Sequence, residues 1–248
     1  RRARRIRLAW VRPRSRSRRR AFRQLWAAPL LVRLVAGAAA ILVLILVVNW
    51  LYQVIRKPAE MFFPVSGALH KTPSETWRQY GPLFREHSTA VMTPEMLAAL
   101  AQVEGAGNPV ARTYWRWRLT WNPFEMYKPA SSAVGMYQIT NAAFRDAKRY
   151  CIHDHVVVED GPWNDWGSCW FSSLYTRVIP SHAIEMTSAF LDRSVARTLE
   201  RQRIAGVTLQ QKQDLAAVIH LCGNGAGDAY TRRGFQLSAA ARCGDHDA

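Results

Sequence analysis

Acidic residues are absent from the first 33 positions of the chain, although these positions hold 13 of its 34 lysines and arginines. The remaining residues carry 21 basic against 18 acidic side chains, so the net charge of +16 belongs almost entirely to this segment. A domain that binds nucleic acid is expected to carry its own basic surface. The charge distribution therefore disfavours a nucleic-acid-binding domain and indicates a basic tail over residues 1–33.

Charged side chains are also missing from residues 34–52, which are rich in leucine, isoleucine and valine. About 20 apolar residues are needed to cross the hydrocarbon core of a bilayer as a helix, so this segment is predicted to be a single transmembrane helix. Trp50 and Tyr52 are typical of a membrane interface, and arginines before a span favour a cytoplasmic N-terminus. Residues 53–72 contain proline and glycine and are expected to form a periplasmic stalk.

Other interpretations of this N-terminal region remain open. A cleaved signal peptide has small residues directly after its apolar core, whereas polar and bulky residues follow this one. The arginine-rich tail could contact anionic lipid, nucleic acid or a cytoplasmic protein. Lipid contact together with a role in topology is the simplest of these. The expected location is a bacterial inner membrane, crossed once, with the domain in the periplasm.

The four cysteines, Cys151, Cys169, Cys222 and Cys243, all follow the apolar segment. An even number of cysteines in an exported domain is typical of disulfides. Sequence proximity favours Cys151 with Cys169 and Cys222 with Cys243 among three possible pairings, and free buried thiols are the alternative. The chain lacks the paired Cys-x-x-Cys or spaced histidine pattern typical of zinc, so no metal site is expected.

Long runs of alternating apolar and polar residues, typical of strands, are missing after residue 72, whereas several helix starts can be recognised. Thr208 and Gln211 form a capping-box sequence, and Asn141 is expected to cap a helix that runs to Tyr150. About 175 residues in roughly five helices can bury one core. We therefore predict a single, mainly α-helical domain over residues 73–248.

One acidic side chain lies at the end of an expected helix. Thr93 and Pro94 are a typical helix start, and the helix runs to Glu104, which is followed by Gly-Ala-Gly-Asn-Pro. Leu97, Leu100 and Glu104 share one stripe of this helix. A carboxyl group held against apolar surface has a raised pKa and can keep a proton near neutral pH, as a general acid requires. A helix-end residue without a chemical role is the competing interpretation.

Two further segments follow the Glu104 segment in the sequence. Residues 133–138 read Ala-Val-Gly-Met-Tyr-Gln, and residues 222–225 read Cys-Gly-Asn-Gly, with Tyr230 shortly after. In this order the three segments resemble the Glu-Ser-x-x-Asn-Pro, Gly-Leu-Met-Gln and Ala-Tyr-Asn-x-Gly motifs of the soluble, lysozyme-like (SLT) lytic transglycosylases. The resemblance covers residues 89–235 and implies a lysozyme-like fold.

The chain departs from these motifs in several places. Gly105 stands where the family has Ser, Met136-Tyr137 stands where it has Leu-Met, and Gly223 replaces the aromatic residue before Asn. An insertion rich in aromatic residues, 111–134, lies between the first two motifs. Its side chains can stack on sugar rings, fill a core or pair with a membrane partner.

The resemblance implies a peptidoglycan lytic transglycosylase that acts on glycan strands without a cofactor. Glu104 would protonate the glycosidic oxygen between N-acetylmuramic acid and N-acetylglucosamine and would then deprotonate the C6 hydroxyl, which closes a 1,6-anhydro ring. The expected substrate contacts are Gln138, Tyr137, Asn224 and Tyr230. No second carboxylate can be assigned from the sequence.

Two alternatives to this function are kept open. A muramidase of the goose-lysozyme kind would use the same glutamate with a water molecule. A degenerate domain could instead bind glycan without cleaving it, or serve as a structural subunit of an envelope-spanning complex.

Overall fold

The computed structural model describes residues 27–62, 65–165, 167–238, 242–243 and 246–247. It divides into two compact units, Arg1–Tyr52 and Gln53–Ala248. Most of the basic tail expected over residues 1–33 lies outside the described residues.

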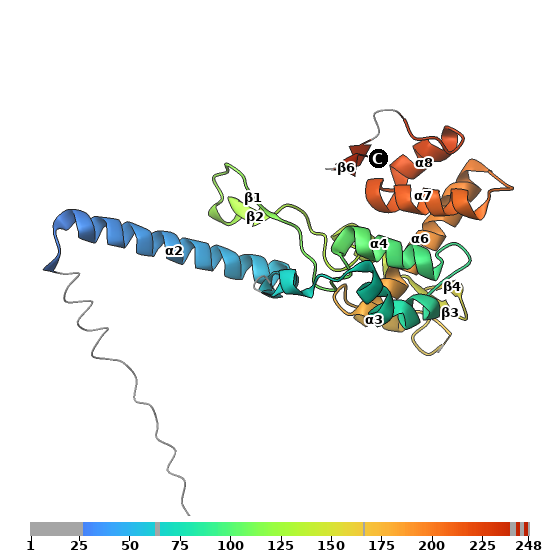
Figure 1. The fold of residues 1–248 in the computed structure, drawn as a ribbon, viewed down its shortest axis with the longest axis horizontal. Helices are drawn as coiled ribbons and strands as arrows, with labels where there is room; N and C mark the ends of the chain where they lie inside the picture. Colours follow the sequence, from blue (N-terminus) through green and yellow to red (C-terminus); the bar gives the residue numbers. More distant parts are fainter. Residues whose placement is uncertain (1–26, 63–64, 166, 239–241, 244–245, 248) are drawn as a thin grey trace, which may run out of the picture. The chain divides into compact units, whose positions relative to one another are not determined.

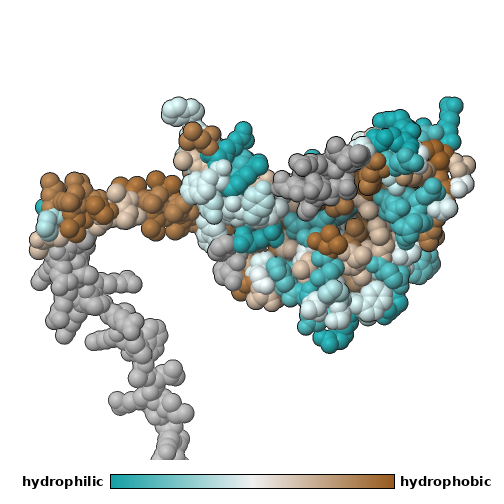
Figure 2. Space-filling view, turned by 45° about the horizontal axis from the view of Figure 1, so that its top comes forward, coloured by the Kyte–Doolittle hydropathy of each residue, from teal (hydrophilic) through white to brown (hydrophobic). Residues whose placement is uncertain are grey.

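The described part of the first unit is formed by helix α2, which covers Leu30–Arg56 and extends into the second unit (Figure 1). At 1.5 Å per residue its 27 residues span about 40 Å, more than the roughly 30 Å of a hydrocarbon core. Apart from Val54, its leucine, isoleucine and valine side chains are exposed and form the apolar surface coloured brown in Figure 2. The helix is thus long and apolar enough to cross a membrane, and it is longer at both ends than the predicted span of residues 34–52.

Helices dominate the described part of the second unit, which confirms the mainly α-helical prediction. They are α3 (Pro73–Glu86), α4 (Pro94–Gly105), α5 (Asn141–Ala147), α6 (Pro180–Gln202), α7 (Leu209–Cys222) and α8 (Asn224–Arg232). The longest of them, α6, contacts α3, α5, α7 and α8 and is the central element of this unit.

Short antiparallel hairpins and 3-10 turns connect the helices. The paired strands are β1 (Trp115–Trp117) with β2 (Tyr127–Pro129), β3 (Tyr150–His153) with β4 (Val156–Glu159), and β5 (Arg242–Cys243) with β6 (His246–Asp247). The 3-10 turns are η1 (Pro58–Phe62), η2 (Ser66–Leu69), η3 (Pro123–Glu125) and η4 (Trp170–Leu174). A lone two-stranded hairpin is marginally stable, so each of these depends on its contacts with the helices.

Helix boundaries follow the local capping chemistry. Thr93 and Thr208 cap α4 and α7 as predicted, each accepting a hydrogen bond from a backbone N–H of the first turn. Helix α5 is capped by Thr140, one residue before the expected Asn141. It also ends before Tyr150, because this residue begins β3 and pairs with β4.

The hydrophobic core joins α4, α6 and α7 to the loop of the second motif. Its fully buried members include Leu97, Met136, Tyr137, Ile184, Leu191 and Leu215. Burying a large apolar side chain of this kind contributes about 1.5–3 kcal/mol. The end of α4, which carries Glu104, is therefore held against the second motif by packing.

Residues 53–72, expected to form the stalk, lie within the same compact unit as the helical domain. The hydroxyl of Ser66 donates to the Val110 carbonyl, and the Asn108 side chain donates to the Ser66 carbonyl at 2.6 Å. Asn108 belongs to the Asn-Pro pair of the first motif and is fully buried. The segment between α2 and α3 is therefore tied to the loop that follows α4.

One expected disulfide is confirmed. Cys151 of β3 is bonded to Cys169, directly before η4, with a Cα–Cα distance of 5.4 Å. The side chain of Cys243 lies outside the described ones, so its pairing with Cys222 stays a prediction.

Candidate functional site

Glu104 lies in the last turn of α4, where its side chain is 13% exposed. The helix ends at Ala106, which adopts a left-handed conformation and returns its N–H to the carbonyls of Ala101 and Gln102. Gly105 lies against the backbone of Met136. The first and second motifs, 32 residues apart at Glu104 and Met136, are thus in direct contact.

His220 of α7 faces the Glu104 carboxyl group, with Nε2 3.8 Å from Oε1. Burial lowers the pKa of His220 to about 4, although a hydrogen bond to the Tyr137 backbone opposes this. The ring is therefore neutral near pH 7. The contact therefore joins the Glu104 carboxyl group to an uncharged ring.

Gln138 adopts a left-handed backbone conformation, with φ of 44°, which is uncommon for a residue other than glycine. Its side chain donates to the Gly135 carbonyl at 2.9 Å. Gly135 itself has no room for a side chain, because a Cβ there would clash with the carbonyl oxygen of Arg177. The turn therefore holds Gln138 in one orientation at the wall of the Glu104 cavity.

The cavity beside Glu104 has a volume of about 490 Å³. Its polar side chains come from α4, from η2 and the residue after it, from the insertion and from the second motif: Ser66, His70, Gln102, Glu104, Arg112, Thr113, Tyr114 and Gln138. Glu104 is the only carboxylate among its described lining residues. A carboxyl group that acts as general acid or base in this cavity would therefore be Glu104, and His70 is the imidazole among the same residues.

A second cavity, of about 320 Å³, is also lined by Gln138. His220, Asn224 and Asp146 contribute to its wall. The conformation of Gly223, with φ of 83° and ψ of 169°, is open essentially only to glycine, and it allows α8 to begin directly after α7. An aromatic side chain at position 223 would be strained in this conformation.

Two expected substrate contacts are buried away from the Glu104 cavity. Tyr137 is fully buried and donates its hydroxyl hydrogen to the Leu97 carbonyl at 3.1 Å. Tyr230 is 6% exposed, packs edge-to-face on Phe235 and lines a third cavity, which Glu104 does not line. Burial raises the pKa of both tyrosines. We therefore assign both side chains to packing and leave them out of the proposed substrate contacts.

Three other acidic side chains near the motifs have local partners. Glu125 pairs with Lys128 at 3.2 Å, Asp228 pairs with Arg201, and Asp165 accepts a hydrogen bond from the Gly167 backbone. Within the described ranges, histidine, cysteine, aspartate and glutamate form no group of three that could hold a metal ion.

The sequence did not single out His220 or Arg112. The only signal for His220 is its position four residues after Ala216, which places a polar ring on the buried stripe of α7. Arg112 lies in the insertion, where the family motifs provide no guide.

Comparison with protein-family models, with curated proteins and with solved structures finds no significant match for this chain.

Proposed function

We propose that this chain is a membrane-anchored peptidoglycan lytic transglycosylase in which Glu104 is the general acid and then the general base. The observation that carries the proposal is the convergence of Glu104 and Gln138 on one cavity in which Glu104 is the only carboxylate among the described lining residues. A hydrolase that inverts or retains by the usual routes needs a second carboxylate across the bond. A transglycosylase needs one, because its nucleophile is a hydroxyl of the substrate.

In the proposed reaction Glu104 donates its proton to the glycosidic oxygen as the bond to C1 of N-acetylmuramic acid breaks. The acetamido oxygen of the same sugar stabilises the positive charge that develops at C1. The carboxylate of Glu104 then removes the proton of the C6 hydroxyl, whose oxygen bonds to C1 and closes the 1,6-anhydro ring. Atoms balance without water or a cofactor, and Glu104 recovers its proton.

Other side chains would position the strand. Gln138 and Asn224 offer amide groups from two adjoining cavities, where they could contact the acetamido groups of successive sugars. Arg112 lines the Glu104 cavity and could pair with the lactyl or peptide carboxylate of the strand. The ring of His220, which is neutral near pH 7, would lie beside the Glu104 carboxyl group.

The cellular location is part of the proposal. Helix α2 would cross the bacterial inner membrane with its N-terminus in the cytoplasm, because the arginines precede it. A reporter that functions only in the periplasm, fused after Ala248, is expected to be active. Activity of a cytoplasm-only reporter at this position would contradict both the orientation and the peptidoglycan substrate.

Mass spectrometry of purified sacculi tests the activity directly. The full chain in detergent should be used, since Gln53 and Lys57 of the membrane-proximal segment make hydrogen bonds with the domain. The expected products end in 1,6-anhydro-N-acetylmuramic acid and are about 18 Da lighter than hydrolysed ends, because ring closure uses an internal hydroxyl. Ends that borohydride reduces would show a muramidase instead.

A non-catalytic glycan-binding or structural role is the second candidate. The burial of Tyr137 and Tyr230 favours it, because two of the four expected substrate contacts then cannot reach a strand in the Glu104 cavity. In the same experiment this role predicts that the folded chain sediments with sacculi and releases no fragments.

A further inference from the structure

The β1–β2 hairpin exposes large apolar side chains at its tip. Leu119 and Trp121, in the loop between the strands, are 99% and 103% exposed, and Trp117 of β1 is 66% exposed. Figure 1 shows this hairpin standing apart from helices α3 to α8. Clustered apolar side chains that do not join the core of their own domain mark an interaction surface.

The tip of this hairpin is hydrogen-bonded to the last turns of α2. The side chain of Gln53 donates to the carbonyl oxygen of Phe124, in the loop between β1 and β2, at 2.7 Å. Gln53 directly follows Tyr52, the last residue of the uncharged apolar segment. Trp121 is three residues from Phe124, so its Cα lies at most about 10 Å from that of Phe124.

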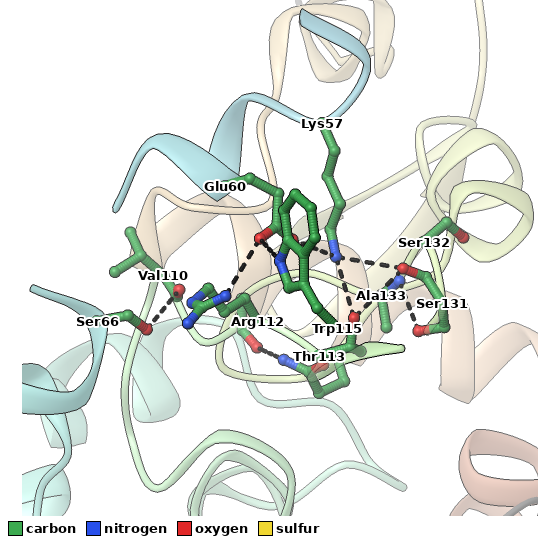
Figure 3. Close-up of polar contacts among 12 residues, drawn as sticks. Lys57, Glu60, Ser66, Val110, Arg112, Thr113, Trp115, Ser131, Ser132 and Ala133 are labelled. Carbon is green, nitrogen blue, oxygen red and sulfur yellow. Dashed lines mark hydrogen bonds and ion pairs between the residues drawn. The ribbon is translucent and has the colours of Figure 1, made fainter. Parts of the chain in front are cut away.

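The base of the hairpin is fixed to the same region by a buried carboxylate. The Glu60 side chain has no exposed surface; it accepts a hydrogen bond from Trp115 Nε1 at 2.8 Å and pairs with Lys57 at 3.0 Å and Arg112 at 3.4 Å. Lys57 also donates to the Ser131 carbonyl, just after β2. Figure 3 shows Lys57, Arg112 and Trp115 converging on Glu60. The hairpin is therefore held at both its base and its tip by residues 53–60.

The charges of the hairpin suit an anionic lipid surface. Arg116 and Arg118 are exposed, Lys128 is basic, and the one acidic residue between them, Glu125, is paired with Lys128. Tryptophan is enriched at the interface between hydrocarbon and headgroups, and basic residues near this interface are attracted by anionic lipids. The interfacial layer is about 5–7 Å thick on each side of the hydrocarbon core, which is within the reach of a loop bound to Gln53.

We propose that the tip of the β1–β2 hairpin, with Leu119 and Trp121, inserts into the interfacial layer of the membrane that α2 crosses, while Arg116 and Arg118 contact anionic headgroups. The inference rests on the membrane anchoring proposed above and does not depend on catalysis. Arg112, Thr113 and Tyr114 lead into β1 and also line the Glu104 cavity. Insertion would thus fix the distance of this cavity from the membrane. The Glu104 site would then act on glycan strands close to the bilayer.

Lipid quenching in the full chain tests this contact. An environment-sensitive fluorescent amino acid is placed at position 119, and the protein is reconstituted into vesicles of phosphatidylethanolamine and phosphatidylglycerol that contain a lipid with a nitroxide near its headgroup. Position 156 is the matched control, because Val156 is a 64% exposed apolar residue at the start of β4 in another hairpin. Position 43, near the middle of the apolar segment, reports whether α2 is in the bilayer, in parallel vesicles whose lipid carries the nitroxide on its acyl chain.

Quenching at position 119 is expected to exceed that at position 156 at least about twofold, with blue-shifted emission, as for a side chain in the interface. Trp121→Ser should reduce the quenching at position 119, whereas Trp163→Ser, at an 80% exposed tryptophan outside the hairpin, should not. Quenching at position 43 but not at position 119 would overturn the inference alone. Blue-shifted emission at position 119 without quenching would indicate a protein partner or a second copy and would also overturn it. No quenching at position 43 would contradict the membrane anchoring itself.

Discussion

A Cβ atom added to Gly105 would lie 2.8 Å from the Cα of Met136 and 2.9 Å from its carbonyl oxygen. The helix that carries Glu104 therefore touches the backbone of the second motif. No space remains for the serine that lysozyme-like transglycosylases have at this position. Glycine at position 105 is thus a packing requirement of this chain.

Gly105→Ser is expected to destabilise the protein by about 1–3 kcal/mol, because the backbone at Met136 would have to move. Chemical unfolding of the full chain in detergent, followed by circular dichroism, measures this loss. Gly225→Ala is the matched control: a Cβ there meets nothing within 4 Å, and alanine is favoured over glycine in a helix. A Gly105→Ser protein as stable as wild type would contradict the close contact between the two motifs.

Glu104→Gln is expected to lower the release of anhydro-muropeptides at least about a hundredfold, the usual scale of a general acid-base contribution. Glutamine keeps the size of the side chain and removes the proton that the leaving oxygen needs. Glu95→Gln, an exposed substitution in the first turn of the same helix, should retain wild-type turnover. If the Glu104→Gln protein retained more than a tenth of wild-type turnover, Glu104 would be excluded as the general acid.

The helix starts could be predicted from sequence because capping is local. The side chain of Thr93 or Thr208 accepts a hydrogen bond from a backbone N–H three residues later, and this contact does not depend on distant parts of the chain. The end of α5 could not be predicted in this way, since Tyr150 pairs with β4 rather than continuing the helix. Local pattern therefore identified several helix starts, whereas α8 and the three hairpins were not predicted and tertiary pairing set the end of α5.

The candidate site was only partly predictable for the same reason. Glu104 was recognised because a carboxyl group on an apolar stripe is unusual within a single helix. His220 faces it from α7, and this pairing across 116 residues leaves no trace in the local sequence. The hydroxyl of Tyr137 has a partner in Leu97 of α4, which turns this side chain into the core. From its residue type alone, Tyr137 was consistent with a sugar contact.

Replacing both Cys151 and Cys169 with serine is expected to lower the free energy of unfolding by about 3 kcal/mol, the chain-entropy value for closing a loop of this size. The bridge spans a sequence separation of 18 residues and joins β3 to the start of η4. Non-reducing peptide mapping should recover Cys151 joined to Cys169, and it also tests the predicted pair Cys222 and Cys243. Quantitative alkylation of all four cysteines without a reductant would contradict both bridges.

The stability of the domain should depend on pH through His220. Its pKa is about 4 in the folded chain because the ring is buried, against an ordinary value of about 6.5 in an unfolded one. Between these values the unfolded state binds more protons than the folded state, so stability falls as the pH falls through this window. At pH 7 the ring is neutral in both states and contributes almost nothing. Between pH 7 and pH 5 the loss is about 2 kcal/mol.

Comparison with His220→Gln isolates this loss, because glutamine does not titrate while every other group is unchanged. Unfolding of both full-length proteins is measured in detergent at pH 7 and pH 5. The wild type is expected to lose about 2 kcal/mol more than the variant over this range. An equal loss in the two proteins would show that the ring is not buried beside Glu104.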